Sequence, residues 1–160
     1  DLVTPDLHMN RSEVNACELI TRVVLPFKSV LEKLDTELEL VVPSEPLPLL
    51  TDPQRFEASL TALLDNATDA VEKGRSKRKV SVISEISGEH LCIRVSDTGV
   101  GIPEDLLQKV WMPFFSYGRK GKMGLGLALV RKFANVSGGS VSIESDIQSG
   151  TTITLLLPVG

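Results

Sequence analysis

Aromatic side chains and cysteines are scarce in this chain. Only 4% of its 160 residues are aromatic, so its core has to be built from Leu, Val, Ile and Ala. The two cysteines, Cys17 and Cys92, lie in apolar segments without metal-ligand spacing, which favours reduced, buried thiols and a cytoplasmic compartment. No apolar run reaches the roughly 18 residues of a membrane-spanning helix, and no signal-peptide pattern opens the chain.

Positive charge is also in short supply. The net charge of −4 argues against a general affinity for nucleic acid or membranes, so a phosphate ligand would need a local basic cluster. The length predicts a single domain, residues 1–160, with a core of its own. Because the chain does not begin with Met, we expect it to be a domain of a longer protein.

Apolar residues at helical spacing predict three longer helices. The first covers about 12–34, with Ser12 as its N-cap and a kink at Pro26. The second covers about 52–73 and starts at an Asp-Pro pair, which is a typical cap and first turn. The third covers about 125–136.

Alternating apolar and polar residues predict the strands. One strand is expected at 37–42, a hairpin at 79–86 and 90–96, and two final strands at 140–145 and 151–157. Together with the helices, these strands predict an α+β fold, a two-layer α/β sandwich. Its sheet is mixed but mainly antiparallel, has about five strands, and carries the three longer helices on one face.

Polar residues interrupt the apolar stripe of the second helix in the stretch "LLDNATDAVEKG", residues 63–74. Ala62, Asn66, Asp69 and Lys73 follow one another at three- and four-residue spacings, so they share one helix face. The Asn66 amide is a satisfied core amide, a solvated side chain, or a hard oxygen ligand of the kind that Mg²⁺ accepts. Lys73 is placed to reach a phosphate as a point charge.

Two glycine-containing stretches carry the next signals. "DTGVGIP", residues 97–103, is either an ordinary surface turn or a turn against which a ligand lies on bare backbone. "PFFSYGRKGKMGLGLALV", residues 113–130, combines four glycines with the basic residues Arg119, Lys120 and Lys122 before a helix start. This second stretch is either a mobile loop with solvated charges or an anion site and a lid over phosphates.

The order of these motifs, closed by a late Gly150-Thr151, resembles the Bergerat-fold ATP-binding family. That family includes gyrase B subunits, a heat-shock chaperone, the mismatch-repair ATPase and histidine kinases. "LLDNATDA" is similar to the Asn box of the family, "DTGVGIP" to the first glycine box, "PFF" to the Phe box and "GLGLALVRKF" to the second glycine box. The resemblance spans roughly residues 10–158.

The resemblance implies ATP and Mg²⁺ as ligands. Asp97 would accept a hydrogen bond from the adenine amino group, Asn66 would coordinate Mg²⁺, residues 113–124 would form the ATP lid, and Thr151 would help to hold the adenine. The cofactor-binding residues implied in this way are Asn66, Asp69, Ala70, Lys73, Asp97, Gly99, Gly101, Ile102, Phe115, Arg119, Lys120, Lys122, Gly124, Leu125, Gly126, Leu127 and Thr151.

The hydrolysing branches of the family carry a glutamate four residues before the Asn, where this chain has Ala62. No residue here is therefore expected to act as general base or nucleophile, which suits a kinase whose acceptor lies elsewhere. The chain resembles the catalytic ATP-binding domain of short-lid sensor histidine kinases. His8 and His90 lack the acidic, helical setting of an acceptor, so we expect the phosphoaccepting hairpin N-terminal to residue 1.

The chain departs from the short-lid pattern at two places. Tyr117 and Gly118 stand where Thr and Lys are usual, which leaves the phosphate contact open among the three basic residues of the lid. Asp69 and Ala70 stand where many relatives have Lys-Tyr, so Lys73 becomes the better candidate for a phosphate contact.

The implied partners are the dimerisation and phosphoacceptor hairpin of the same kinase and a response regulator. We expect no nucleic acid, no direct membrane contact and a monomeric isolated domain, whereas membrane anchoring of the full-length protein stays open. The alternative functions are a nucleotide-driven conformational ATPase of the gyrase or chaperone kind and a non-catalytic nucleotide-binding module.

Overall fold

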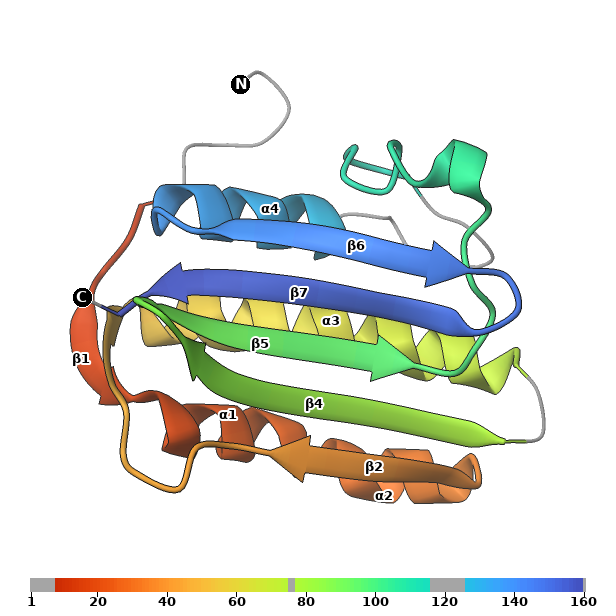
Figure 1. The fold of residues 1–160 in the computed structure, drawn as a ribbon, viewed down its shortest axis with the longest axis horizontal. Coiled ribbons are helices and arrows are strands. Elements are labelled where there is room, and N and C mark those ends of the chain that lie inside the picture. The colour runs from red at the N-terminus through yellow and green to blue at the C-terminus, as the bar shows by residue number, and fades with distance from the viewer. Residues whose placement is uncertain (1–7, 75–76, 116–125, 160) are drawn as a thin grey trace.

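The computed structural model describes residues 8–74, 77–115 and 126–159 (Figure 1). Within these ranges, no helix is both long enough and apolar enough to cross a bilayer. All peptide bonds described are trans.

A five-stranded sheet forms one layer of the molecule (Figure 1). Its order is β2-β4-β5-β7-β6, where β2 pairs with β4 in parallel and the other neighbours are antiparallel. The predicted mixed, mainly antiparallel sheet of about five strands is confirmed. The strands are β2 (Thr36–Val41), β4 (Arg78–Ser87), β5 (His90–Asp97), β6 (Ser140–Asp146) and β7 (Gly150–Pro158).

Helices cover one face of this sheet, as predicted (Figure 1). The second and third predicted helices are α3 (Pro53–Glu72) and α4 (Gly126–Val136). The first is divided at Pro26 into α1 (Ala16–Val24) and α2 (Phe27–Lys33), because proline cannot donate the backbone hydrogen bond that a continuous helix needs. A short 3₁₀ turn, η1 (Glu104–Leu106), follows β5.

The predicted N-cap at Ser12 is wrong. Ser12 begins a short strand, β1 (Ser12–Asn15), which pairs antiparallel with β3 (Pro48–Thr51). Asn15 caps α1 instead, because its side-chain oxygen accepts from the backbone N–H of Cys17 at 3.1 Å and from that of Leu47 at 3.2 Å. The Asn15 amide thus bonds both the start of α1 and the segment that leads into β3, which the local pattern around Ser12 did not reveal.

The core lies between the sheet and the helices, with α3 at its centre. Leu, Val, Ile and Ala supply most of it, as the scarcity of aromatics required. Phe56 of α3 and Phe133 of α4 are both buried and pack edge to face, with ring centroids 6.3 Å apart. Cys92 is buried and Cys17 half-buried, and both are free thiols, so the prediction of burial holds fully only for Cys92.

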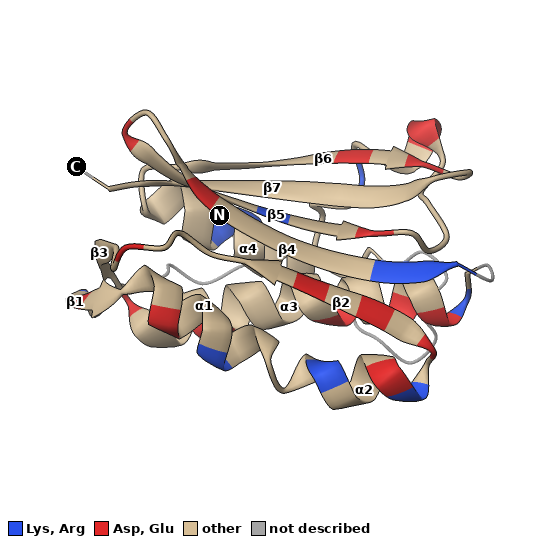
Figure 2. Ribbon diagram, turned by 60° about the horizontal axis from the view of Figure 1, so that its bottom comes forward, with Lys and Arg blue, Asp and Glu red and all other residues tan. Residues whose placement is uncertain are grey.

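Charged residues gather on β2 and at the start of β4, at one edge of the sheet (Figure 2). Lys79 of β4 lies 3.6 Å from Glu37 and 3.3 Å from Glu39 of β2. These pairs are largely exposed, so they contribute little to stability but keep charge on an edge strand, which discourages pairing with other chains.

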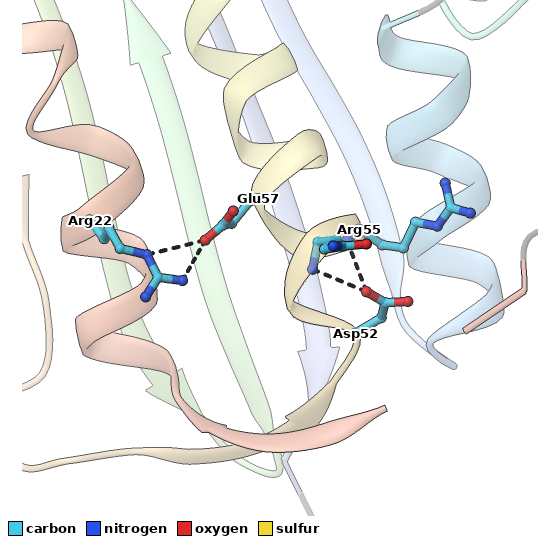
Figure 3. A network of polar contacts seen from close by, with 5 residues as sticks. Arg22, Asp52, Arg55 and Glu57 are labelled. Carbon is cyan, nitrogen blue, oxygen red and sulfur yellow. Dashed lines mark hydrogen bonds and ion pairs between the residues drawn. The ribbon is translucent and has the colours of Figure 1, made fainter. Parts of the chain in front are cut away.

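The start of α3 is fixed by the carboxylate of Asp52 (Figure 3). One oxygen accepts from the backbone N–H groups of Gln54 at 3.0 Å and Arg55 at 3.2 Å, and the other accepts from that of Asn10 at 2.8 Å. Burial alone would raise the pKa of Asp52, but these three hydrogen bonds outweigh it and hold the pKa below its ordinary value. The same carboxylate therefore anchors both the helix and the segment that precedes β1.

Replacing Asp52 by Ala should lower the free energy of unfolding by about 1–3 kcal/mol, because the cap and the bond to Asn10 are both lost. Denaturant titration measures the change. The matched control is Glu57→Ala, which removes only the ion pair with Arg22 on α1, where the side chains are 38% and 67% exposed (Figure 3). That control should cost no more than about 1 kcal/mol. Equal losses in both variants would contradict the role given to Asp52.

Candidate functional site

A cavity open to solvent lies between α3, the end of β5 and the start of β7. Its walls are mainly apolar, and polar groups enter it only at a few points. The apolar residues that line it include Leu63, Ala67, Val95, Val100, Val110, Ile143 and Ile153. An apolar cleft with a few convergent polar side chains is the usual form of a small-molecule site.

Most of the predicted cofactor-binding residues in the described ranges come together in this cavity. Those that line it are Asn66, Asp69, Ala70, Lys73, Asp97, Ile102, Phe115, Leu127 and Thr151. Gly99, Gly101 and Gly126 are not among the lining residues and have packing roles instead. Arg119, Lys120, Lys122, Gly124 and Leu125, which belong to the predicted lid and the second glycine box, lie outside the described residues.

Asp97 is the last residue of β5 and faces the helix layer, where only 9% of it is exposed. One carboxylate oxygen accepts from the backbone N–H of Gly99 at 2.9 Å. Burial raises the pKa of Asp97 to about 7, even though the backbone N–H groups of Gly99 and Thr151 lower it. The cavity thus holds a carboxyl group that has no cationic partner in the described part of the chain and that favours a hydrogen-bond donor from a ligand.

Asn66 projects from α3 with both polar atoms of its side chain buried. Neither its Oδ1 nor its Nδ2 has a hydrogen-bond partner among the described residues. Because a buried, unsatisfied amide is costly, the interpretation of Asn66 as a satisfied core amide does not hold. An amide oxygen left open beside a ligand cavity fits the hard oxygen chemistry of Mg²⁺, which takes few protein ligands and completes its shell with water and phosphate oxygens.

Two glycines let the turn after β5 pass close to other backbone segments. A Cβ on Gly99 would lie 2.2 Å from the carbonyl carbon of Ala70 in α3, and one on Gly101 would lie 2.0 Å from the carbonyl oxygen of Asp146. The backbone N–H of Val100 donates to the Ala70 carbonyl at 3.1 Å. Only glycine permits these approaches, so the turn closes the cavity by locking onto α3 and onto the end of β6.

Ser145, near the end of β6, is a residue that the sequence reasoning missed. Its hydroxyl accepts from the backbone N–H of Ile102 at 2.8 Å, and its oxygen lies 2.7 Å from the Thr151 hydroxyl and 3.1 Å from the Gly150 carbonyl oxygen. Val141, Ile143 and Ser145 alternate along β6, so Ser145 lies on the same face of the strand as the two apolar residues. That polar residue on an inward-facing position was the available signal.

Comparison with known proteins gives the class. The model of the family described as histidine kinase-, DNA gyrase B-, and HSP90-like ATPases matches residues 51–160. This chain belongs to that family. The match covers α3, the cavity and the sheet from β4 onward, which are the elements that carry the site.

Its relatives include sensor histidine kinases. The chain is 31% identical to the sensor histidine kinase RcsC of Salmonella typhimurium over 94% of its own length, and it spans 15% of the length of that protein. Among solved structures, the catalytic domain of histidine kinase ThkA is 28% identical with a TM-score of 0.81, covering 94% of this chain and 99% of that one. ThkA in complex with the response regulator protein TrrA is 25% identical with a TM-score of 0.78, covering 95% of this chain and 42% of that one.

The raised pKa of Asp97 predicts a pH dependence of folding stability. The folded state holds this proton up to about pH 7, whereas a free aspartic acid side chain has a pKa of 3.8. The stability linked to protonated Asp97 is therefore fully present below pH 3.8 and is lost as the pH rises to about 7. Asp97→Asn does not ionise. The difference in unfolding free energy, variant minus wild type, should therefore grow by on the order of 2–4 kcal/mol between pH 4 and 8.

Urea unfolding of the nucleotide-free protein at several pH values measures that difference. The matched control is Asp105→Asn, which changes an exposed carboxylate of η1 and should track wild type. A constant difference for Asp97→Asn across this range would show that the carboxyl ionises with its ordinary pKa.

Proposed function

We propose that this chain binds Mg·ATP and supplies the γ-phosphoryl group to a histidine on a separate dimerisation and phosphoacceptor domain. The phosphoryl group then passes to an aspartate of a response regulator in two-component signalling. The observation that carries the proposal is the convergence of Asp97, Thr151 and Asn66 on one apolar cavity.

The apolar walls and the polar end of the cavity suit an adenine base. In its ionised form, the Asp97 carboxyl group accepts from the amino group of adenine, whereas guanine offers an oxygen acceptor at that point and is repelled. A hydrogen bond to a charged group contributes about 1.5–3 kcal/mol. The apolar side chains that line the cavity, among them Ile153 and Val100, pack against the faces of the adenine ring.

The phosphates extend from the base toward the exposed side of α3. Asn66, with its unpartnered amide, is the residue that would hold Mg²⁺, and Mg²⁺ when bound neutralises phosphate charge and orients the oxygens. Lys73 at the C-cap of α3 lines the same cavity and supplies a positive charge to the phosphates. The remaining phosphate contacts fall to the predicted lid.

Ala62 supports phosphotransfer rather than hydrolysis. It lies one helical turn before Asn66, where an alanine side chain cannot accept a proton from water. A Cβ on Gly126, the first residue of α4, would stand only 3.3 Å from the Ala62 methyl, so α4 packs directly over this position. The protein positions the ATP, and the nucleophile comes from outside.

Neither described histidine suits the role of acceptor for this ATP. His90 begins β5 and Asp97 ends it, so about 23 Å of extended strand separates them. His8 is exposed and lies ahead of β1. We therefore assign the acceptor histidine to a partner domain, a helical hairpin of the same kinase. The proposal also holds that the isolated chain is a monomer, that it acts in the cytoplasm, and that it does not bind nucleic acid. The complex of ThkA with TrrA supports a response regulator as the second partner.

Calorimetric titration of Mg·ATP tests the proposal directly. Wild type should bind, and Asp97→Asn should bind about tenfold more weakly or worse, because the charge-assisted bond to the amino group is lost. The exposed Asp105→Asn serves as the control and should bind like wild type. Absence of binding by wild type would overturn the proposal.

The same samples, prepared with ATP labelled at the γ-phosphate, are assayed for released phosphate and for label that stays on the protein. Both should be negligible, because the chain has neither a base at Ala62 nor an acceptor. Steady hydrolysis would instead favour a conformational ATPase of the gyrase or chaperone kind, and label on His8 or His90 would contradict the external acceptor.

The assignment of Mg²⁺ to Asn66 has its own test. For Asn66→Ala, the gain in ATP affinity that Mg²⁺ gives wild type should shrink about three- to tenfold, while affinity in EDTA stays within about twofold. Titrations with and without Mg²⁺ measure both quantities. Asn135→Ala, at an exposed position of α4, is the matched control. An equal loss with and without Mg²⁺ would show that Asn66 acts only in packing.

A further inference from the structure

Three polar side chains form a row across neighbouring strands at one end of the sheet. Asp97 of β5 is the register partner of Thr151 in β7, and Thr151 is the register partner of Ser145 in β6. Asp97 and Thr151 line the cavity, whereas Ser145 does not and lies behind Thr151 on the edge strand. Ser145 can therefore affect a ligand only through its neighbours.

The Ser145 hydroxyl joins three groups but has a single proton. It accepts from the backbone N–H of Ile102 at 2.8 Å, which leaves its proton for one of two acceptors. These are the carbonyl oxygen of Gly150 at 3.1 Å and the hydroxyl oxygen of Thr151 at 2.7 Å.

The destination of that proton decides what Thr151 offers to the cavity. When Ser145 donates to Gly150, the Thr151 hydroxyl donates to Ser145 and presents only lone pairs elsewhere. When Ser145 donates to Thr151, the proton of Thr151 has to point away from Ser145, and Thr151 becomes a donor toward the cavity. The Thr151 hydroxyl is thus a donor or an acceptor toward the cavity, depending on which oxygen receives the Ser145 proton.

We propose that Ser145 is a positioning residue that makes the Thr151 hydroxyl a hydrogen-bond donor to the adenine ring nitrogen next to the amino group. The proposal rests on the proposed function. Adenine presents a donor, the amino group, and beside it an acceptor, the ring nitrogen N1. An acceptor at Asp97 and a donor at Thr151 match that pair, and a 6-oxopurine presents the reverse pair.

Ser145 also fixes one wall of the same pocket. Its bond to the Ile102 N–H holds the end of the glycine turn to β6, where a Cβ on Gly101 would already meet the Asp146 carbonyl at 2.0 Å. Ile102 lines the cavity, so a single hydroxyl positions both an apolar and a polar contact with the base.

The test compares ATP with 1-deaza-ATP, in which a C–H replaces ring nitrogen N1. Wild type should prefer ATP by about three- to tenfold, which is the contribution of one neutral hydrogen bond. In Ser145→Ala this preference should fall to within about twofold. Ser145→Thr keeps the hydroxyl and should retain the preference. Ser142→Ala, on the same strand but at an exposed position without a described side-chain hydrogen bond, is the matched control.

A second route keeps the proposal testable if Ser145→Ala does not fold. Ser145→Cys keeps the volume with a weak donor and should lose the preference as well. In a Thr151→Val background, Ser145→Ala should leave the ratio of the two affinities unchanged, because the hydroxyl that it orients is gone.

The outcomes separate the two proposals. If wild type binds ATP and Ser145→Ala weakens ATP and 1-deaza-ATP by the same factor, Ser145 is only structural and the inference is overturned while the proposed function stands. An unchanged preference in Ser145→Ala and Ser145→Cys overturns it equally. If wild type binds neither nucleotide, the proposed function itself fails, and the inference fails with it.

Discussion

The burial of one carboxyl group, that of Asp97, sets the terms for the rest of the site. A carboxylate at the end of a central strand is costly in an apolar cavity, and its pKa of about 7 expresses that cost. The turn that follows β5 supplies the N–H of Gly99 as partial compensation. The turn can do so only because it passes within contact distance of the α3 backbone. The packing of the glycine turn against α3 is thus tied to the environment of one buried carboxyl group.

Asn66, on α3, is a second residue whose polar side-chain atoms are buried at a cost in stability. Among the described residues, the Asn66 amide has no hydrogen-bond partner and the buried Asp97 carboxyl group has no cationic partner, and both line the same cavity. A protein that held these groups for stability alone would have satisfied them internally. Local destabilisation concentrated at one cavity is the pattern expected where a ligand completes the interactions. The Asp52 cap and the apolar core around Phe56 offset that destabilisation at the other end of α3.

The sequence predicted the elements whose signals are local. Apolar periodicity placed α3 and α4, and the proline signals gave the division at Pro26 and the start of α3 at Pro53. The cavity-lining positions of Asp97 and Asn66 were predicted from their motifs rather than from periodicity. The β1–β3 pairing was missed because it joins segments that are far apart in the chain. Since Ser12 belongs to that pairing, α1 begins later and is capped by Asn15. Ser145 was missed for a similar reason, since its role arises from the register of β6 against β7.

The closure of the cavity by backbone has a consequence for inhibition. Ala70 and Val100 both line the cavity and are joined there by a main-chain hydrogen bond, and no side chain larger than hydrogen fits at Gly99 without moving α3. A compound that reaches the main chain at this contact would bind atoms that every amino acid shares. Substitution cannot remove main-chain atoms, and enlarging Gly99 damages the fold together with the site. Resistance to such a compound would have to arise from other parts of the cavity.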